Sequence, residues 1–361
     1  LLCCSAVALL MLAMLGMAIF ASFASFWPYN LTPSLRHYVL GLVDGEVGEG
    51  FVNSLKMAAG TAFFGTLLVF FGAYLLEKTK GAPLLRGPVR MLAMLPMAVP
   101  GLVLGLGYIF FFNAPNNPLH GLYQTTALLT LCTIIHFYTT GHLTAVTALK
   151  SLDSEFEAVS ASLKVPWFRT FWRVTLPICT PAMVDIARYF FVNAMTTISA
   201  VVFLYSPDTK VASIAILNLD EAGEIGAAAA MAVMIAAISA VSTGVFMLLF
   251  LDLAYERRKA AGRLRTRDDL VEAVIEGAVG RVRPKMMTVA AAFAGLLPLM
   301  WSTGSGADAM KRVAAPMVGG LATSFLLELL VYPALYAIWK WDFAMRRGTR
   351  VPTPASATSA F

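Results

Sequence analysis

Long apolar stretches make up most of the chain and alternate with shorter polar segments. A helix of roughly 17 to 25 mostly apolar residues is long enough to cross about 30 Å of hydrocarbon. Eight stretches come close to this length and predict spans near 1–26, 52–76, 91–113, 122–149, 182–205, 226–254, 286–301 and 313–339. The seventh is short and contains Pro298, so a re-entrant hairpin is the alternative there. The pattern predicts an all-α, polytopic transmembrane protein.

Composition and charge agree with this class. The chain is 58% hydrophobic and 13% charged, whereas soluble domains keep about a quarter of their residues charged. Most of its 27 Lys and Arg residues fall on alternate predicted loops, which predicts that both termini are cytoplasmic. The net charge of +6 follows from this bias, so we expect contact with anionic lipids and no nucleic-acid partner.

The chain begins Leu1-Leu2-Cys3-Cys4, with no initiator Met and no charged segment. We therefore expect the true amino terminus to lie upstream and the first stretch to be a truncated transmembrane helix. Cys3, Cys4, Cys132 and Cys179 share no metal-ligand spacing and are expected to pack as small hydrophobic residues. His136 and His142 are six residues apart and do not share a helix face. No metal site and no cofactor are expected.

The most informative polar loop covers residues 153–177. Asp153 or Ser154 can cap a short helix whose first turn is acidic, and Pro166 stops that helix. An aromatic and basic run, Trp167 to Arg173, then leads to Leu176-Pro177 and back into the membrane. Composition alone leaves two interpretations, an interfacial helix that only anchors the loop and a helix that docks on a partner protein.

This loop resembles the EAA loop of ABC importer permeases. Glu157, Ala158, Val174, Leu176 and Pro177 match its pattern, and Pro166-Trp167 is a pair common in such loops. The resemblance implies that the helix docks into a groove of a cytoplasmic ATP-binding subunit and transmits its closure. There are two departures: Val159 replaces the second alanine, and Leu163 stands where glycine is usual. We expect Leu163 to alter the turn, because a residue with a Cβ loses the positive-φ region.

The resemblance covers residues 1–241. The segments Asn53-Ser54-Leu55, Leu95 to Gly101 and Thr197 to Pro207 are similar to permeases of 2-aminoethylphosphonate importers, which are relatives of ferric-iron permeases. It implies six spans that form the second half of a bacterial inner-membrane permease. The implied partners are an ATP-binding subunit, a periplasmic solute-binding protein, a second permease half and the lipid bilayer. The chain has no G-x-x-x-x-G-K-[ST] phosphate loop, so the ATPase is expected on another subunit and no enzyme activity is expected here.

Two groups of residues are candidates for the substrate path. The third span contains Pro96, Pro100 and Gly101, which interrupt helical hydrogen bonding and leave backbone groups without partners. These residues either line the substrate path or only kink and pack the helix. Asn193, Thr196, Thr197 and Ser199 in the fifth span can hydrogen-bond a small zwitterion, and interhelical packing is the alternative. Arg188, a charge near the start of that span, either has a transport role or extends toward the cytoplasm.

Residues 242–347 change character and resemble the last helices of heavy-metal RND efflux pumps of the copper and silver type. The segments Glu272 to Ala278, Arg281 to Lys285, Gly295 to Pro298 and Ala314 to Gly320 carry this resemblance. It implies a cytoplasmic helix near 267–279 and two closing spans. The metal-binding periplasmic domains of such pumps have no counterpart here, so we expect no metal pumping by this segment alone. Residues 348–361 are expected to be a disordered tail. A pump fragment or a non-functional fusion is the alternative to an importer permease.

Overall fold

The computed structural model describes residues 2–43, 45–78, 83–153, 155–260 and 268–279, together with 282, 286, 289–290, 301 and 332–341. The chain divides into two compact units, residues 1–243 and 244–361, and each is described by itself. Most of the seventh and eighth predicted spans, and the whole of the predicted tail, lie outside the described residues.

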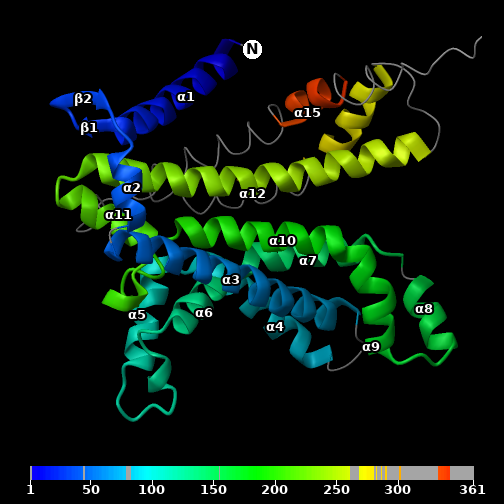
Figure 1. Ribbon diagram of the computed structural model, residues 1–361. Helices are drawn as coiled ribbons and strands as arrows, with labels where there is room; N and C mark the ends of the chain where they lie inside the picture. Colours follow the sequence, from blue (N-terminus) through cyan, green and yellow to red (C-terminus); the bar gives the residue numbers. More distant parts are fainter. Residues whose placement is uncertain are drawn as a thin grey trace, which may run out of the picture. The chain divides into compact units, whose positions relative to one another are not determined.

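The described chain is mostly helical (Figure 1). Its helices are α1 (Leu2–Phe23), α2 (Arg36–Val43), α3 (Gly45–Lys78), α4 (Pro83–Ala98), α5 (Gly101–Phe112), α6 (Thr126–His136), α7 (Tyr138–Lys150), α8 (Glu155–Ser162), α9 (Trp167–Thr170), α10 (Leu176–Thr196), α11 (Ala212–Glu221), α12 (Ile225–Ala260) and α15 (Tyr332–Lys340). Short turns occur at His120–Leu122 and Pro207–Thr209, and a π-helical turn at Phe171–Thr175. Strands β1 (Ala24–Phe26) and β2 (Asn30–Pro33) pair as an antiparallel hairpin, which the all-α prediction did not include.

The prediction of a mostly helical membrane protein is confirmed, but the described residues do not show eight continuous spans. Gly48–Lys78 and Ile225–Val245 are each long and apolar enough to cross a membrane, and α4 with α5, bent by 111°, would make a third. The fourth predicted span is interrupted at Phe137, between α6 and α7. The fifth ends early, because Thr197 takes an extended backbone (ψ 137°) within a β-branched run that disfavours helix.

Helix α3 packs against α6, α7 and α10 in the first unit (Figure 1). The close approach depends on glycine, since a Cβ on Gly65 or Gly141 would lie 3.2 Å from the ring of Phe190. Phe190 is fully buried there with Val69, Ala145 and other apolar side chains. The three helices α3, α7 and α10 therefore meet around one aromatic side chain that fills the space left by two glycines.

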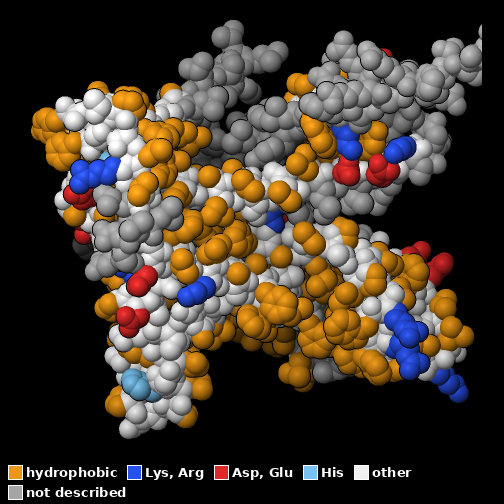
Figure 2. All heavy atoms as spheres, viewed as in Figure 1, with side chains coloured by type: hydrophobic (Ala, Val, Ile, Leu, Met, Phe, Trp, Pro, Cys, Tyr) orange, Lys and Arg blue, Asp and Glu red, His pale blue; other side chains and the backbone are white. Residues whose placement is uncertain are grey.

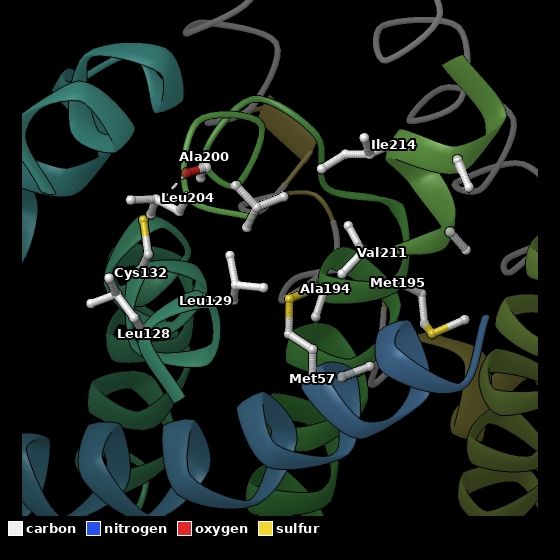
Figure 3. Close-up of a cluster of buried hydrophobic side chains, with 14 of the residues drawn as sticks. Met57, Leu128, Leu129, Cys132, Ala194, Met195, Ala200, Leu204, Val211 and Ile214 are labelled. Carbon is white, nitrogen blue, oxygen red and sulfur yellow. Dashed lines mark hydrogen bonds between the residues drawn. The ribbon is translucent and has the colours of Figure 1, made fainter. Parts of the chain in front are cut away.

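A second apolar cluster joins α3, α6, the end of α10 and the start of α11 (Figure 3). Met57, Leu129 and Met195 lie at its centre, all with no exposed surface. The thiol of Cys132 points to the carbonyl oxygen of Ala200 at 3.5 Å. Cys132 and Cys179 are both free and buried, and they pack among apolar side chains.

The described part of the second unit consists of the end of α12, a helix at residues 268–279, and α15. Its apolar cluster is formed by Met247, Leu251, Tyr255, Leu270, Val274 and Tyr336. Charged side chains add cross-links: Arg258 contacts Glu272 at 2.9 Å and Glu276 at 2.7 Å. Hydrogen bonds from Arg258 to Glu272 and then Glu276 keep the pKa of the guanidinium above its ordinary value.

Candidate functional site: the coupling loop and the broken third span

Helix α8 begins where the sequence predicts a cap. The amide of Glu155 donates to the Asp153 carboxylate at 3.1 Å, so Asp153 satisfies one of the free amides of the first turn. Ser154, the alternative cap, lies outside the described residues. The backbone of Glu157 lies in α8, and Ala158 is exposed in the same helix.

The end of α8 corrects the expectation for Leu163. The amide of Val165 donates to the carbonyl of Ser160 at 3.0 Å, and Lys164 takes φ 53°. This is the Schellman arrangement, in which the left-handed residue usually is glycine. The left-handed position is therefore Lys164, and the absence of glycine at Leu163 costs no backbone strain there.

Three apolar side chains of this segment lie on one exposed face. Phe156, Val159 and Leu163 are spaced by three and four residues, which places them along one side of a helix, and they are 46% to 70% exposed. The face is apolar yet not covered by any described part of the chain. We call it the α8 stripe.

Helix α8 is joined to the helical core through α9. The hydroxyls of Ser160 and Thr170 hydrogen-bond to each other, and Thr170 is buried. Pro166 directly precedes the first turn of α9, and Leu176 and Pro177 form the first turn of α10. Helix α8 is therefore linked to the start of α10 through α9 and the π-helical turn.

Aromatic contacts connect the same segment to α3. The ring of Tyr74 lies 4.7 Å from that of Phe171 and 6.2 Å from that of Trp167. The Tyr74 hydroxyl also donates to the carbonyl of Trp167 at 3.4 Å. The α8–α9 segment is thus attached both to the helix that follows it and to a helix nearly a hundred residues earlier in the chain.

The third predicted span is broken between α4 and α5. Pro96 lies inside α4, and Pro100, with φ −57° and ψ 139°, precedes the first turn of α5. Proline disfavours helical backbone in the residue before it, so the 111° bend falls at this point.

The bend brings together residues from distant parts of the sequence. A Cβ on Gly101 would lie 2.5 Å from the Ser199 hydroxyl oxygen and 2.9 Å from Cε1 of His136. Two predicted path residues therefore meet at a histidine that the sequence argument had set aside. Spacing along one helix cannot reveal such a contact, because His136 and Ser199 belong to different segments.

The other predicted path residues are held by their own helix or its neighbours. The Asn193 amide donates to the carbonyl of Tyr189 at 2.7 Å, and the Thr196 hydroxyl to that of Val192 at 3.1 Å. Thr197 is buried, and its carbonyl accepts a hydrogen bond from Ser213 at 2.6 Å.

Arg188 forms an ion pair with Asp185 at 3.1 Å, with both side chains mostly buried. Asp185 was not among the predicted residues, although a spacing of three residues on a helix places the two side chains next to each other. Arg188 also lies 3.5 Å from the Thr243 hydroxyl. Among the described residues, no group of His, Cys, Asp and Glu side chains is arranged to hold a metal ion.

Comparison with known proteins gives two matches. Residues 65–253 match the binding-protein-dependent transport system inner membrane components, and residues 244–340 match the AcrB/AcrD/AcrF family. The ferric transport system permease protein FbpB of Actinobacillus pleuropneumoniae is 33% identical over 210 residues, which cover 56% of this chain and 29% of that protein. The putative cation efflux system protein SilA of Salmonella typhimurium is 50% identical over 103 residues, or 28% of this chain and 10% of that protein.

A shorter relative, the putative ferric transport system permease-like protein AfuB of Escherichia coli, is 44% identical over 77 residues, or 21% of this chain and 64% of that protein. The chain thus spans less than a third of FbpB and about a tenth of SilA. The resemblance to a permease followed by an efflux-pump segment is confirmed. Because the permease match covers more than half of the sequence, the chain belongs to the family of binding-protein-dependent transport system inner membrane components, with an AcrB/AcrD/AcrF-type segment joined behind it.

Proposed function

We propose that this chain is the permease subunit of an ABC importer and forms the path for a small solute, 2-aminoethylphosphonate, across the bacterial inner membrane. A separate ATP-binding subunit supplies the energy, a periplasmic protein delivers the solute, and a second permease half completes the path. Both termini lie in the cytoplasm, as the distribution of Lys and Arg residues favours.

The α8 stripe carries this proposal. An uncovered apolar face on a short helix favours a protein partner, and Phe156, Val159 and Leu163 provide it. The link from Ser160 to Thr170, and from there to Tyr74 on α3 and to α10, gives a mechanical route. Closure of the ATP-binding subunit would push α8, and the helices attached to it would move with it.

The solute path runs past the bend at Pro100 and Gly101. Ser199 supplies a hydroxyl at that place, and the first backbone amides of α5 have no partner within the helix. A phosphonate carries the negative charge and the acceptor oxygens that such donors bind. Asn193, Thr196 and Arg188 then line the route along α10, with Pro96 and Thr197 shaping its backbone.

Transport by vesicles tests the proposal. Vesicles would contain the full chain, the second permease half and the ATP-binding subunit, with the binding protein and ATP supplied on their proper sides. We expect ATP-dependent accumulation of radiolabelled 2-aminoethylphosphonate. The substitutions Phe156→Ser with Val159→Ser, and separately Glu157→Ala, should lower it at least tenfold, whereas Ser162→Ala, at an exposed position of α8 outside the α8 stripe, should leave it unchanged.

Ferric iron is the second candidate solute, because two relatives are named as ferric transport permeases. Accumulation of radioactive iron in the same vesicles, with no phosphonate uptake, would identify ferric iron as the solute. The proposal that α8 couples transport to the ATP-binding subunit would still hold. Equal uptake by the α8 variants and the unchanged chain would remove the coupling proposal.

The second unit favours a different candidate function, a part of a proton-driven heavy-metal exporter, because of its similarity to cation efflux proteins. Uncoupler-sensitive efflux of copper or silver ions from cells that produce the chain would support it. A chain with neither uptake nor efflux would be a non-functional fusion.

A further inference from the structure

We propose that the outer face of α9 and the π-helical turn binds anionic phospholipid headgroups, through Arg169 and Arg173 together with the exposed rings of Phe168 and Trp172. We call this face the α9 belt. It is distinct from the α8 stripe and does not depend on which solute is transported.

The two faces of this segment have opposite character. Thr170, Phe171 and Thr175 are buried against the helical core. Phe168 and Trp172, in contrast, are 51% and 63% exposed, and the side chains of Arg169 and Arg173 are exposed as well. Aromatic rings of this size lose favourable burial when they face water, and Trp prefers the headgroup level of a bilayer.

The charge of the segment is of one sign. From Leu163 to Val184 the sequence has Lys164, Arg169 and Arg173 and no acidic residue. No ion pair to these three is present in the part of the chain that the structure describes. Where α8 and α9 lie in Figure 1, Figure 2 shows Lys and Arg side chains set into an exposed hydrophobic surface. Cations beside exposed aromatic rings complement an anionic lipid surface.

The depth of the belt also fits a headgroup. The candidate span in α3 is 31 residues long, about 46 Å at a rise of about 1.5 Å per residue, which exceeds the roughly 30 Å of hydrocarbon. Its uncharged run ends at Leu76, before Glu77 and Lys78, and this change marks the headgroup level. Tyr74, less than one turn earlier, contacts Trp167 and Phe171, so the segment packed on it lies at that level.

The backbone presents this face in a fixed orientation. Phe171 packs between the rings of Phe70, Phe71 and Tyr74, and the turn from Phe171 to Thr175 is π-helical. A π-turn widens the helix locally and often occurs at functional positions. Arg169 and Arg173 therefore do not need to order the backbone on binding, which lowers the entropic cost of lipid contact.

Lipid selectivity tests the proposal with the full chain in bilayer nanodiscs. Dibrominated phosphatidylglycerol or dibrominated phosphatidylcholine is included as the same minority fraction, and quenching of tryptophan fluorescence reports which lipid is enriched at the protein. We expect preferential quenching by phosphatidylglycerol that weakens as salt is added. The preference should fall about fivefold for each charge removed in Arg169→Gln and Arg173→Gln.

Matched variants separate a site from general charge. Arg36→Gln with Lys56→Gln removes two exposed cations elsewhere on the first unit and should preserve the preference. Arg169→Lys with Arg173→Lys should also preserve it, and circular dichroism would show that each variant folds. An unchanged preference in the Gln double variant, or an equal loss in the control, overturns the proposal. If the Gln double variant keeps the lipid preference but no longer binds the ATP-binding subunit, the proposal is also overturned, and the belt is a protein-binding face.

Discussion

The helical core around Phe190 and the α8 segment are held in place by different kinds of contact. Phe190 of α10 is completely buried and packs against a glycine on each of two other helices, α3 and α7. Helix α8 has an exposed apolar face, one capping carboxylate, a left-handed lysine at its end and one hydroxyl pair to α9. The core is therefore fixed by shape, whereas α8 is fixed by a few polar contacts, which suits an element that a partner must move.

The largest effect is expected in the core. Phe190→Ala removes an aromatic ring that fills the space beside Gly65 and Gly141, and the cavity should lower the free energy of unfolding by about 3 to 5 kcal/mol. Thermal unfolding in detergent, followed by circular dichroism, measures the loss. Phe63→Ala is the control, since Phe63 lies on α3 but is 62% exposed and should change stability by less than about 0.5 kcal/mol. Equal losses in the two variants would contradict the shape argument.

A smaller and opposite effect is expected at the end of α8. Lys164 takes φ 53°, a conformation that costs a residue with a Cβ about 1 kcal/mol relative to glycine. Lys164→Gly should therefore stabilise α8 and slow amide hydrogen exchange across Glu155–Ser162 about fivefold. Leu163→Gly should give no such protection. If only Leu163→Gly slowed amide exchange, Leu163 and not Lys164 would be the left-handed residue, as the sequence motif suggests.

The sequence predicted the class of protein, the two resemblances, and the α8 helix between Asp153 and Pro166, because these depend on composition and local signals. The family motif puts glycine at position 163, whereas the left-handed residue is Lys164, since a motif gives a spacing but no backbone angle. The sequence also did not predict the meeting of His136 with Gly101 and Ser199, which requires knowledge of how separate helices pack. The Asp185–Arg188 pair, in contrast, follows from the spacing of three residues on a helix and needs no knowledge of the packing.

The smallest effect concerns the link between the two regions. Ser160→Ala removes the hydroxyl that bonds to Thr170 and also lies 3.4 Å from the carbonyl of Val165, and a hydrogen bond of this kind contributes about 1 kcal/mol. Global unfolding should hardly change, because the core around Phe190 does not include Ser160. Exchange of the α8 amides should instead become a few times faster, and in the vesicle assay the solute transported per ATP hydrolysed should fall while binding of the ATP-binding subunit persists. A loss of global stability as large as that of Phe190→Ala would mean that α8 is part of the core, and the contrast between the two regions would no longer hold.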